Sequence, residues 1–215
     1  MTADEEQKPI DRVFAELKAK GLVAAKRKLV CKKPDWWCDF AADRTRPVIY
    51  YNERHSSLPE DPLRFALLHE EYHTFNKKNW TRLSAFYSVC FVIVALAILR
   101  SLGILGVILI PVVLIALWPA SSWVFKTAIR ADETKADLHA AKTLIEEFEI
   151  EEPSVVATSI FKTIRARPRN RRSLTYWVMR FLTAGLHPTD DERIKAIQKY
   201  EESLVKEAVK RMEFS

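Results

Sequence analysis

Cysteine is scarce in this sequence, which holds Cys31, Cys38 and Cys90 among its 215 residues. The number is odd, and the first thirty residues contain no apolar segment of the secretory type, so a disulfide framework is not expected. Cys31 and Cys38 also lack a second cysteine pair that would complete a zinc knot. We therefore expect reduced, partly buried thiols in a reducing compartment.

Internal repeats and low-complexity segments are also missing, and the composition, with 48% apolar and 29% charged residues, is that of a globular protein. The chain is basic, with a net charge of +6 and a sequence pI of about 9.2. Five arginines lie within the eight residues 165–172. No aromatic interleaving or nucleic-acid-binding motif accompanies them, so no nucleic-acid partner is expected. Contact with anionic lipid headgroups and a solvated loop both remain open for this segment.

Residues 47–52, PVIYYN, combine β-branched and aromatic side chains after a proline. This pattern predicts a short strand, placed at a sheet edge because Pro47 has no N–H to donate to a neighbour. The following segment EDPLRFALLHEEYHTF has a helix start, with Asp61 able to cap and Pro62 at the first helical position.

The longest apolar run covers residues 83–118, 36 residues with Arg100 as the one charge. One membrane span takes about 20 residues, so the run is too long for one span and suits two short ones. We predict a hairpin of two transmembrane helices at 83–99 and 102–118, with a turn at Arg100, Ser101 and Gly103. A hairpin buried in a soluble bundle is the alternative.

Basic residues flank this hairpin on both sides, namely Lys77, Lys78, Arg82, Lys126 and Arg130. The positive-inside rule then predicts an integral membrane protein, partnered by the lipid bilayer, with both soluble halves and the active site on the cytoplasmic side.

Four segments follow from these patterns. An N-terminal helical packing segment covers 1–46, and an edge strand with a histidine-bearing helix covers 47–82. The transmembrane hairpin covers 83–118. A second site helix and a C-terminal helical subdomain cover 119–215.

The stretch LLHEEYHTF at positions 67–75 carries two histidines four residues apart, His69 and His73. On a helix, both imidazoles lie on one face and can aim at one zinc ion. Glu70, beside the first ligand, is placed to hold the attacking water and take its proton. A catalytic zinc also needs a third protein ligand and an open fourth position. The other histidines, His55, His139 and His187, and the carboxylates are candidates for the third ligand.

Three motifs occur in the order LLHEEYH, ADETKAD and LHPTDDERI, with the apolar pair between the first two. In this the chain resembles the integral-membrane gluzincin zinc metallopeptidases, the HtpX-like and CAAX prenyl endopeptidase-like proteins. The resemblance covers roughly residues 47–200. It differs from better-known members in having no spans before the first motif and in reading His-Pro-Thr at the third. The protein is also small for the family, so a substrate chamber is not assumed.

The resemblance implies roles for the later motifs. Glu133 would be the third zinc ligand, and Asp137 would hydrogen-bond a ligating histidine and hold its tautomer. His187 would act in catalysis by stabilising the oxyanion. Arg193 would help to organise that region.

The resemblance also implies substrate binding along the strand at 47–52, through Tyr50, Tyr51 and Asn52. Backbone pairing there would hold an extended protein or peptide substrate with little side-chain selectivity. The expected protein is a membrane-anchored zinc endopeptidase, acting in quality control of membrane proteins or in maturation of a precursor.

The expected fold is mainly helical (α+β). It has a zincin-like pair of active-site helices, a small sheet with an edge strand and an inserted two-helix transmembrane hairpin. Two alternatives remain. Residues 47–73 are also similar to soluble regulatory metallopeptidases that cleave phage-type repressors, although the His-Pro and Arg-Ile segment is foreign to them. A non-catalytic membrane protein with a structural zinc site is the other.

Overall fold

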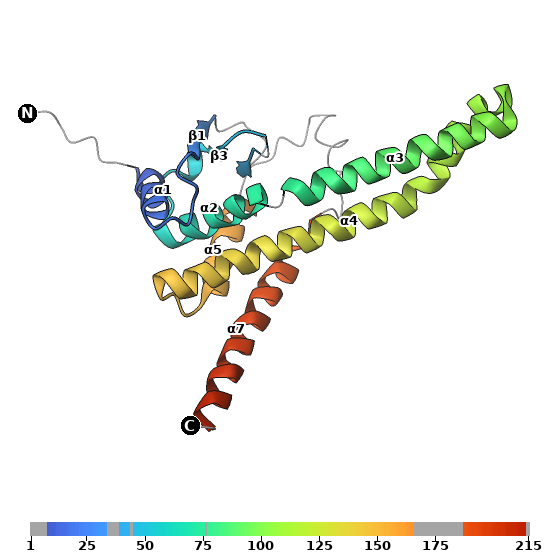
Figure 1. The fold of residues 1–215 in the computed structure, drawn as a ribbon. Helices are drawn as coiled ribbons and strands as arrows, with labels where there is room; N and C mark the ends of the chain where they lie inside the picture. Colours follow the sequence, from blue (N-terminus) through green and yellow to red (C-terminus); the bar gives the residue numbers. More distant parts are fainter. Residues whose placement is uncertain (1–7, 34–38, 44, 76, 166–186, 214–215) are drawn as a thin grey trace, which may run out of the picture.

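The computed structural model describes residues 8–33, 39–43, 45–75, 77–165 and 187–213. Over these residues the protein is mainly helical with one small three-stranded sheet, as expected (Figure 1). Cys31 and Cys90 are free thiols, while Cys38 lies outside the described residues. The same holds for residues 166–172 of the basic segment.

Helix α1, Pro9–Ala19, and helix α2, Glu60–Phe75, pack against each other at the blue end of the molecule in Figure 1. The apolar side chains of α1 recur at helical spacing, so one face is buried, and Gly21 follows the helix with φ 73°. Helix α2 begins at Glu60, so Pro62 lies in its first turn, close to the predicted start. The motif LLHEEYHTF therefore lies on a helix, as predicted.

The sheet contains β1, Lys28–Lys32, β2, Phe40–Ala42, and β3, Val48–Asn52, in the order β1-β3-β2. β3 pairs in parallel with β1 and in antiparallel orientation with β2. The strand at 47–52 was predicted to lie at an edge, and this is wrong, because β3 is the central strand. Pro47 precedes the strand and so removes no donor from it, which leaves both sides of β3 open to pairing.

Helices α3, Lys77–Leu102, and α4, Ile104–Phe148, lie side by side and form the long hairpin of Figure 1. Gly103 makes the turn between them with φ 55°, a conformation that suits glycine. The predicted turn is thus confirmed at Gly103, whereas Arg100 and Ser101 lie in the last turn of α3. The second helix is much longer than 102–118, because it continues without a break through residue 133 to Phe148.

The predicted membrane crossing is not found. A span needs about 20 consecutive, mainly apolar residues in one helix. Among the residues that the structure describes, no helix is both long enough and apolar enough to traverse a bilayer. Both helices of the hairpin extend into charged sequence, from Lys77 in α3 and toward Phe148 in α4, although Phe86, Ile93 and Leu96 are exposed on α3. The transmembrane hairpin and the location as an integral membrane protein with cytoplasmic halves were therefore wrong predictions.

Helices α5, Pro153–Arg165, and α7, Asp190–Glu213, complete the described chain, with the short helix η1, Glu53–His55, after β3. A capping box starts α7. Glu192 N donates to Thr189 Oγ1 at 3.3 Å, and Thr189 N donates to Glu192 Oε2 at 2.7 Å. One core joins α1, α2, α4, α5 and the first turns of α7. Its fully buried members include Leu17, Leu67, Leu144, Ile160 and Ile197.

Candidate metal centre

His69 and His73 lie on the buried face of α2 that is turned toward α4. Their four-residue separation places both imidazoles on the same side of the helix, one turn apart. The two Nε2 atoms are 3.1 Å from each other. Two ring nitrogens therefore face one small volume at the α2–α4 contact, as the spacing predicted.

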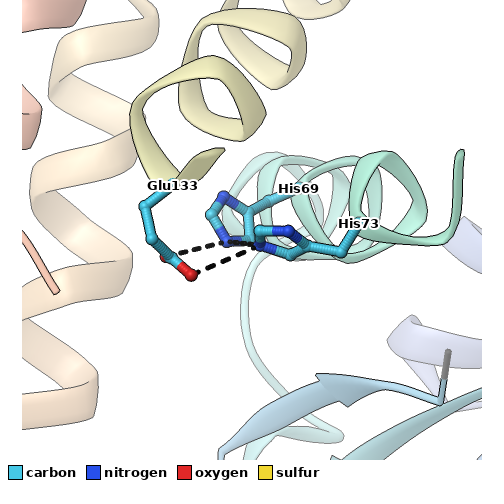
Figure 2. Close-up of side chains that lie close together, drawn as sticks. All are labelled: His69, His73 and Glu133. Atoms are coloured by element: carbon cyan, nitrogen blue, oxygen red, sulfur yellow. Dashed lines mark hydrogen bonds and ion pairs between the residues drawn. The ribbon is translucent and has the colours of Figure 1, made fainter. Parts of the chain in front are cut away.

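Glu133 reaches the same volume from α4. Its Oε2 lies 3.5 Å from His69 Nε2, and its Oε1 lies 3.5 Å from His73 Nε2. One ligand atom from each of the three side chains can be chosen so that all lie within 4.8 Å of one another. Figure 2 shows the carboxylate pointing at the two rings from the opposite helix. This group could hold a metal ion.

Small side chains on α4 let the two helices approach closely enough for this contact. Ala136, Ala140 and Ala141 are fully buried, and α4 packs against α2 more extensively than against any other described element. His139, considered as a third ligand, instead contacts Tyr72, with ring centroids 5.5 Å apart. In the described part of the chain, the histidines of α2 are joined by Glu133 in the candidate metal group.

His69 is held from behind by Asp137, one turn after Glu133. Asp137 is fully buried, and its Oδ1 lies 2.9 Å from His69 Nδ1. Because a carboxylate only accepts, Nδ1 carries a proton, and Nε2 is the ring nitrogen left to face a metal. Arg193 fixes the carboxylate in turn, donating from Nε to Asp137 Oδ2 at 2.7 Å and from Nη2 to Oδ1 at 2.5 Å. The guanidinium of Arg193 also stacks on the ring of Phe161, 4.2 Å from its centroid.

His73 has a carboxylate behind it as well. Asp132 Oδ2 lies 3.1 Å from His73 Nδ1, and both side chains are buried. Asp132 was not among the predicted site residues, because the resemblance implies roles only for Glu133 and Asp137 in that motif. The available signal was an acidic residue immediately before the ligand on a helix whose neighbouring alanines indicate burial.

The ionisation of the cluster follows from burial and neighbouring charge. Burial lowers the pKa of His69, but hydrogen bonds to Asp137 and Glu133 outweigh it and raise the pKa to about 10. Burial and the charge of His69 lower the pKa of His73. Although burial acts to raise it, hydrogen bonds to His187 and His69 hold the pKa of Glu133 well below its ordinary value. Without a metal, the carboxylate is therefore ionised, His73 is neutral and His69 is protonated at neutral pH. A metal that binds here must displace the Nε2 proton of His69.

Glu70 extends from α2 toward the sheet. Its Oε2 accepts a hydrogen bond from the backbone N–H of Ala42 in β2 at 2.6 Å. On either side of β2, Asp39 O accepts from Asn52 N and Asp43 N donates to Val48 O, so residues 39 and 43 face β3. The backbone N–H and C=O groups of successive residues point to opposite sides of a strand, so the N–H of Ala42 faces away from β3. The edge of β2 that faces away from β3 thus lies beside Glu70.

His187 lies near the cluster, before the start of α7. Its Nδ1 is 3.3 Å from Glu133 Oε1, while 59% of the side chain stays exposed. Arg193 Nη2 lies 4.0 Å from Glu133 Oε2. The structure therefore brings the residues of all three motifs to one place.

The predicted substrate residues Tyr50, Tyr51 and Asn52 lie on the central strand. Their backbones pair with β1, and those of Tyr50 and Tyr51 also face β2. Tyr51 and Asn52 are buried, and Asn52 caps η1 by accepting from Arg54 N at 3.3 Å. This strand therefore presents no open edge to an extended peptide.

A scan against protein-family models finds no match for this chain, and searches of curated proteins and of solved structures find no similar protein.

Proposed function

We propose that this protein is a zinc-dependent endopeptidase of the gluzincin type. The observation that carries the proposal is the meeting of His69, His73 and Glu133, with both Nε2 atoms 3.5 Å from the carboxylate oxygens. Two imidazole nitrogens and one carboxylate are a common donor set of catalytic zinc, which leaves a fourth position for water or substrate. When bound there, zinc would lower the pKa of a water and polarise the peptide carbonyl.

Glu70 is the proposed general base. It directly follows a ligand on α2 and does not belong to the metal group. Its negative charge opposes the effects of burial and of His69, which lower the pKa of His73, so the carboxylate lies near the group. In the reaction, the water oxygen bonds to the carbonyl carbon while Glu70 takes the water proton. The C–N bond then breaks, and Glu70 passes that proton to the leaving amine.

His187 is the proposed oxyanion donor. It is mostly exposed and lies 3.3 Å from Glu133, so its ring is within reach of a carbonyl bound in front of the cluster. A donor preorganised at this point would stabilise the negative charge that develops on the carbonyl oxygen.

The substrate edge is proposed to be β2 rather than β3. The outer side of β2 carries the Ala42 N–H, and that N–H already contacts the carboxylate of Glu70. An extended peptide that adds to this edge would pass the proposed base, held mainly by backbone hydrogen bonds. The substrate class is therefore an unstructured protein or peptide segment.

The deciding experiment compares wild type with Glu70→Gln for zinc content and for cleavage of an unfolded polypeptide. The variant should retain zinc but lose cleavage by at least about a hundredfold, because only the base is removed. Glu146→Gln, an exposed change at the far end of α4, is the matched control and should cleave like wild type. Unchanged cleavage by Glu70→Gln would exclude this mechanism. Zinc binding without cleavage by the wild type would favour a structural zinc site.

A further inference from the structure

Helix α4 directs three carboxylates at α2, and the third has no role in the proposed function. Glu133 faces the Nε2 atoms, and Asp137 faces His69 Nδ1. Asp132 is 5% exposed, and its Oδ2 lies 3.1 Å from His73 Nδ1. Burying a carboxylate is costly unless it is paired, so a position such as Asp132 is not an ordinary solvated helix face.

We infer that Asp132 is a positioning residue that holds His73 in the metal-binding tautomer and orientation. The inference rests on the proposed metal group. Asp132 accepts a hydrogen bond from Nδ1 of His73. The proton then sits on Nδ1, and the Nε2 lone pair is directed at the volume shared with His69 and Glu133. Without this acceptor the imidazole is free to carry its proton on Nε2 instead.

Two aspartates of α4, Asp132 and Asp137, flank the candidate ligand Glu133. Helical geometry places residues 132 and 137 on either side of Glu133, with Asp137 one turn ahead of it. Each aspartate contacts the Nδ1 of a different histidine on α2. Both imidazoles of the candidate site are thus oriented from the same helix that supplies the third ligand. Sliding or rotating α4 against α2 would disturb the ligand and both orienting contacts together.

Asp132→Asn is the informative variant, because it keeps the shape but replaces an obligate acceptor by an amide that also donates. An amide N–H facing Nδ1 would favour the tautomer with the proton on Nε2. The protonated Nε2 then has no lone pair for the metal. Carboxylates that orient metal-binding histidines are typically worth ten- to hundredfold in metal affinity. The zinc dissociation constant, measured by chelator competition, should therefore rise about ten- to hundredfold.

Two further readouts separate positioning from a general loss of structure. The visible absorption spectrum of the cobalt(II)-substituted protein should change in Asp132→Asn, because the geometry at His73 changes. Asp132→Glu, which restores an acceptor, should bind zinc more tightly than Asp132→Asn. Asp191→Asn, exposed on α7, is the control for loss of one negative charge and should match wild type in both measurements.

His73→Ala distinguishes failure of this inference from failure of the metal site. If His73→Ala binds zinc like wild type, the site itself is wrong. If His73→Ala loses zinc while Asp132→Asn keeps wild-type affinity and an unchanged cobalt spectrum, the role of Asp132 is wrong and the site stands. Equal zinc affinities for Asp132→Asn and Asp132→Glu would also overturn the inference, whether or not either variant is less stable.

Discussion

Arg27 and Glu71 form a buried, doubly hydrogen-bonded ion pair. Arg27 Nε donates to Glu71 Oε2 at 2.7 Å and Nη2 to Oε1 at 2.9 Å, with 7% and 0% of the two side chains exposed. Glu71 Oε1 also accepts from Ala24 N. Neighbouring glutamates of α2 thus differ in their contacts, since Glu70 meets β2 and Glu71 ties α2 to the segment before β1.

Glu71→Gln should destabilise the protein strongly. It leaves the guanidinium of Arg27 buried without its counter-charge, and breaking a buried pair in this way costs about 3–5 kcal/mol. Urea unfolding monitored by circular dichroism measures the change. The control is Glu146→Gln, which removes an exposed partner of Lys142 and should cost less than about 0.5 kcal/mol. Equal unfolding midpoints for the two variants would show that the pair contributes no more than a surface contact.

Arg193→Lys should weaken zinc binding by about tenfold while leaving the fold intact. Lysine cannot reproduce the two parallel hydrogen bonds to Asp137 or the stacking on Phe161, so the acceptor behind His69 becomes less well fixed. Chelator competition gives the affinity. Arg130→Lys, at an exposed pair with Glu192, is the matched control. Wild-type affinity in Arg193→Lys would mean that Asp137 needs no such support.

Ala42→Pro tests β2 as the substrate edge. Proline removes an N–H that faces Glu70 and not β3, so the pairing within the sheet survives. We expect kcat/KM for an unfolded substrate to fall about tenfold, the worth of one hydrogen bond, with zinc content unchanged. Ala41→Pro is the control. It removes the N–H of the residue that pairs with Tyr50 in β3, so this variant should lose stability instead. Full activity in Ala42→Pro would place the substrate elsewhere.

The turn between β2 and β3 should show a charge-dependent stability at low pH. Asp43 accepts from the hydroxyl and the N–H of Thr45 and from Arg46 N, and these bonds lower its pKa from 3.8 to about 2. A depressed carboxyl pKa stabilises the fold above the unfolded value and stops doing so as pH falls through the folded value. Wild type should therefore exceed Asp43→Asn in stability above pH 4, and the difference should shrink as pH falls and vanish below pH 2.

Carboxyl NMR titration of Asp43 gives the pKa directly, and unfolding of both variants across the same pH range gives the difference. Asp191→Asn corrects for net charge. A measured pKa of Asp43 near 3.8, or an undiminished stability difference at pH 2, would contradict the assignment.

Local rules were enough to locate much of the fold. The four-residue spacing of His69 and His73, the capping box at Thr189 and the turn at Gly103 depend on neighbours within one or two helical turns. Such short-range geometry can be predicted from residues a few positions apart in the sequence. The same rules wrongly predicted that residues 47–52 form an edge strand. The partners of β3 are β1 and β2, and Pro47 carries no information on which strands pair with β3.

The sequence by itself determined which two imidazoles share a helix face, and its resemblance to a known family implied the third member of the group. Only tertiary structure decided that α4 runs unbroken from the hairpin to that motif, that Asp132 lies behind His73, and that β2 lies beside Glu70. It also decided against the predicted membrane span within the described residues. The physical reason is that periodicity sets the face of an element, whereas the packing angle and the close approach of α2 and α4 set what that face meets.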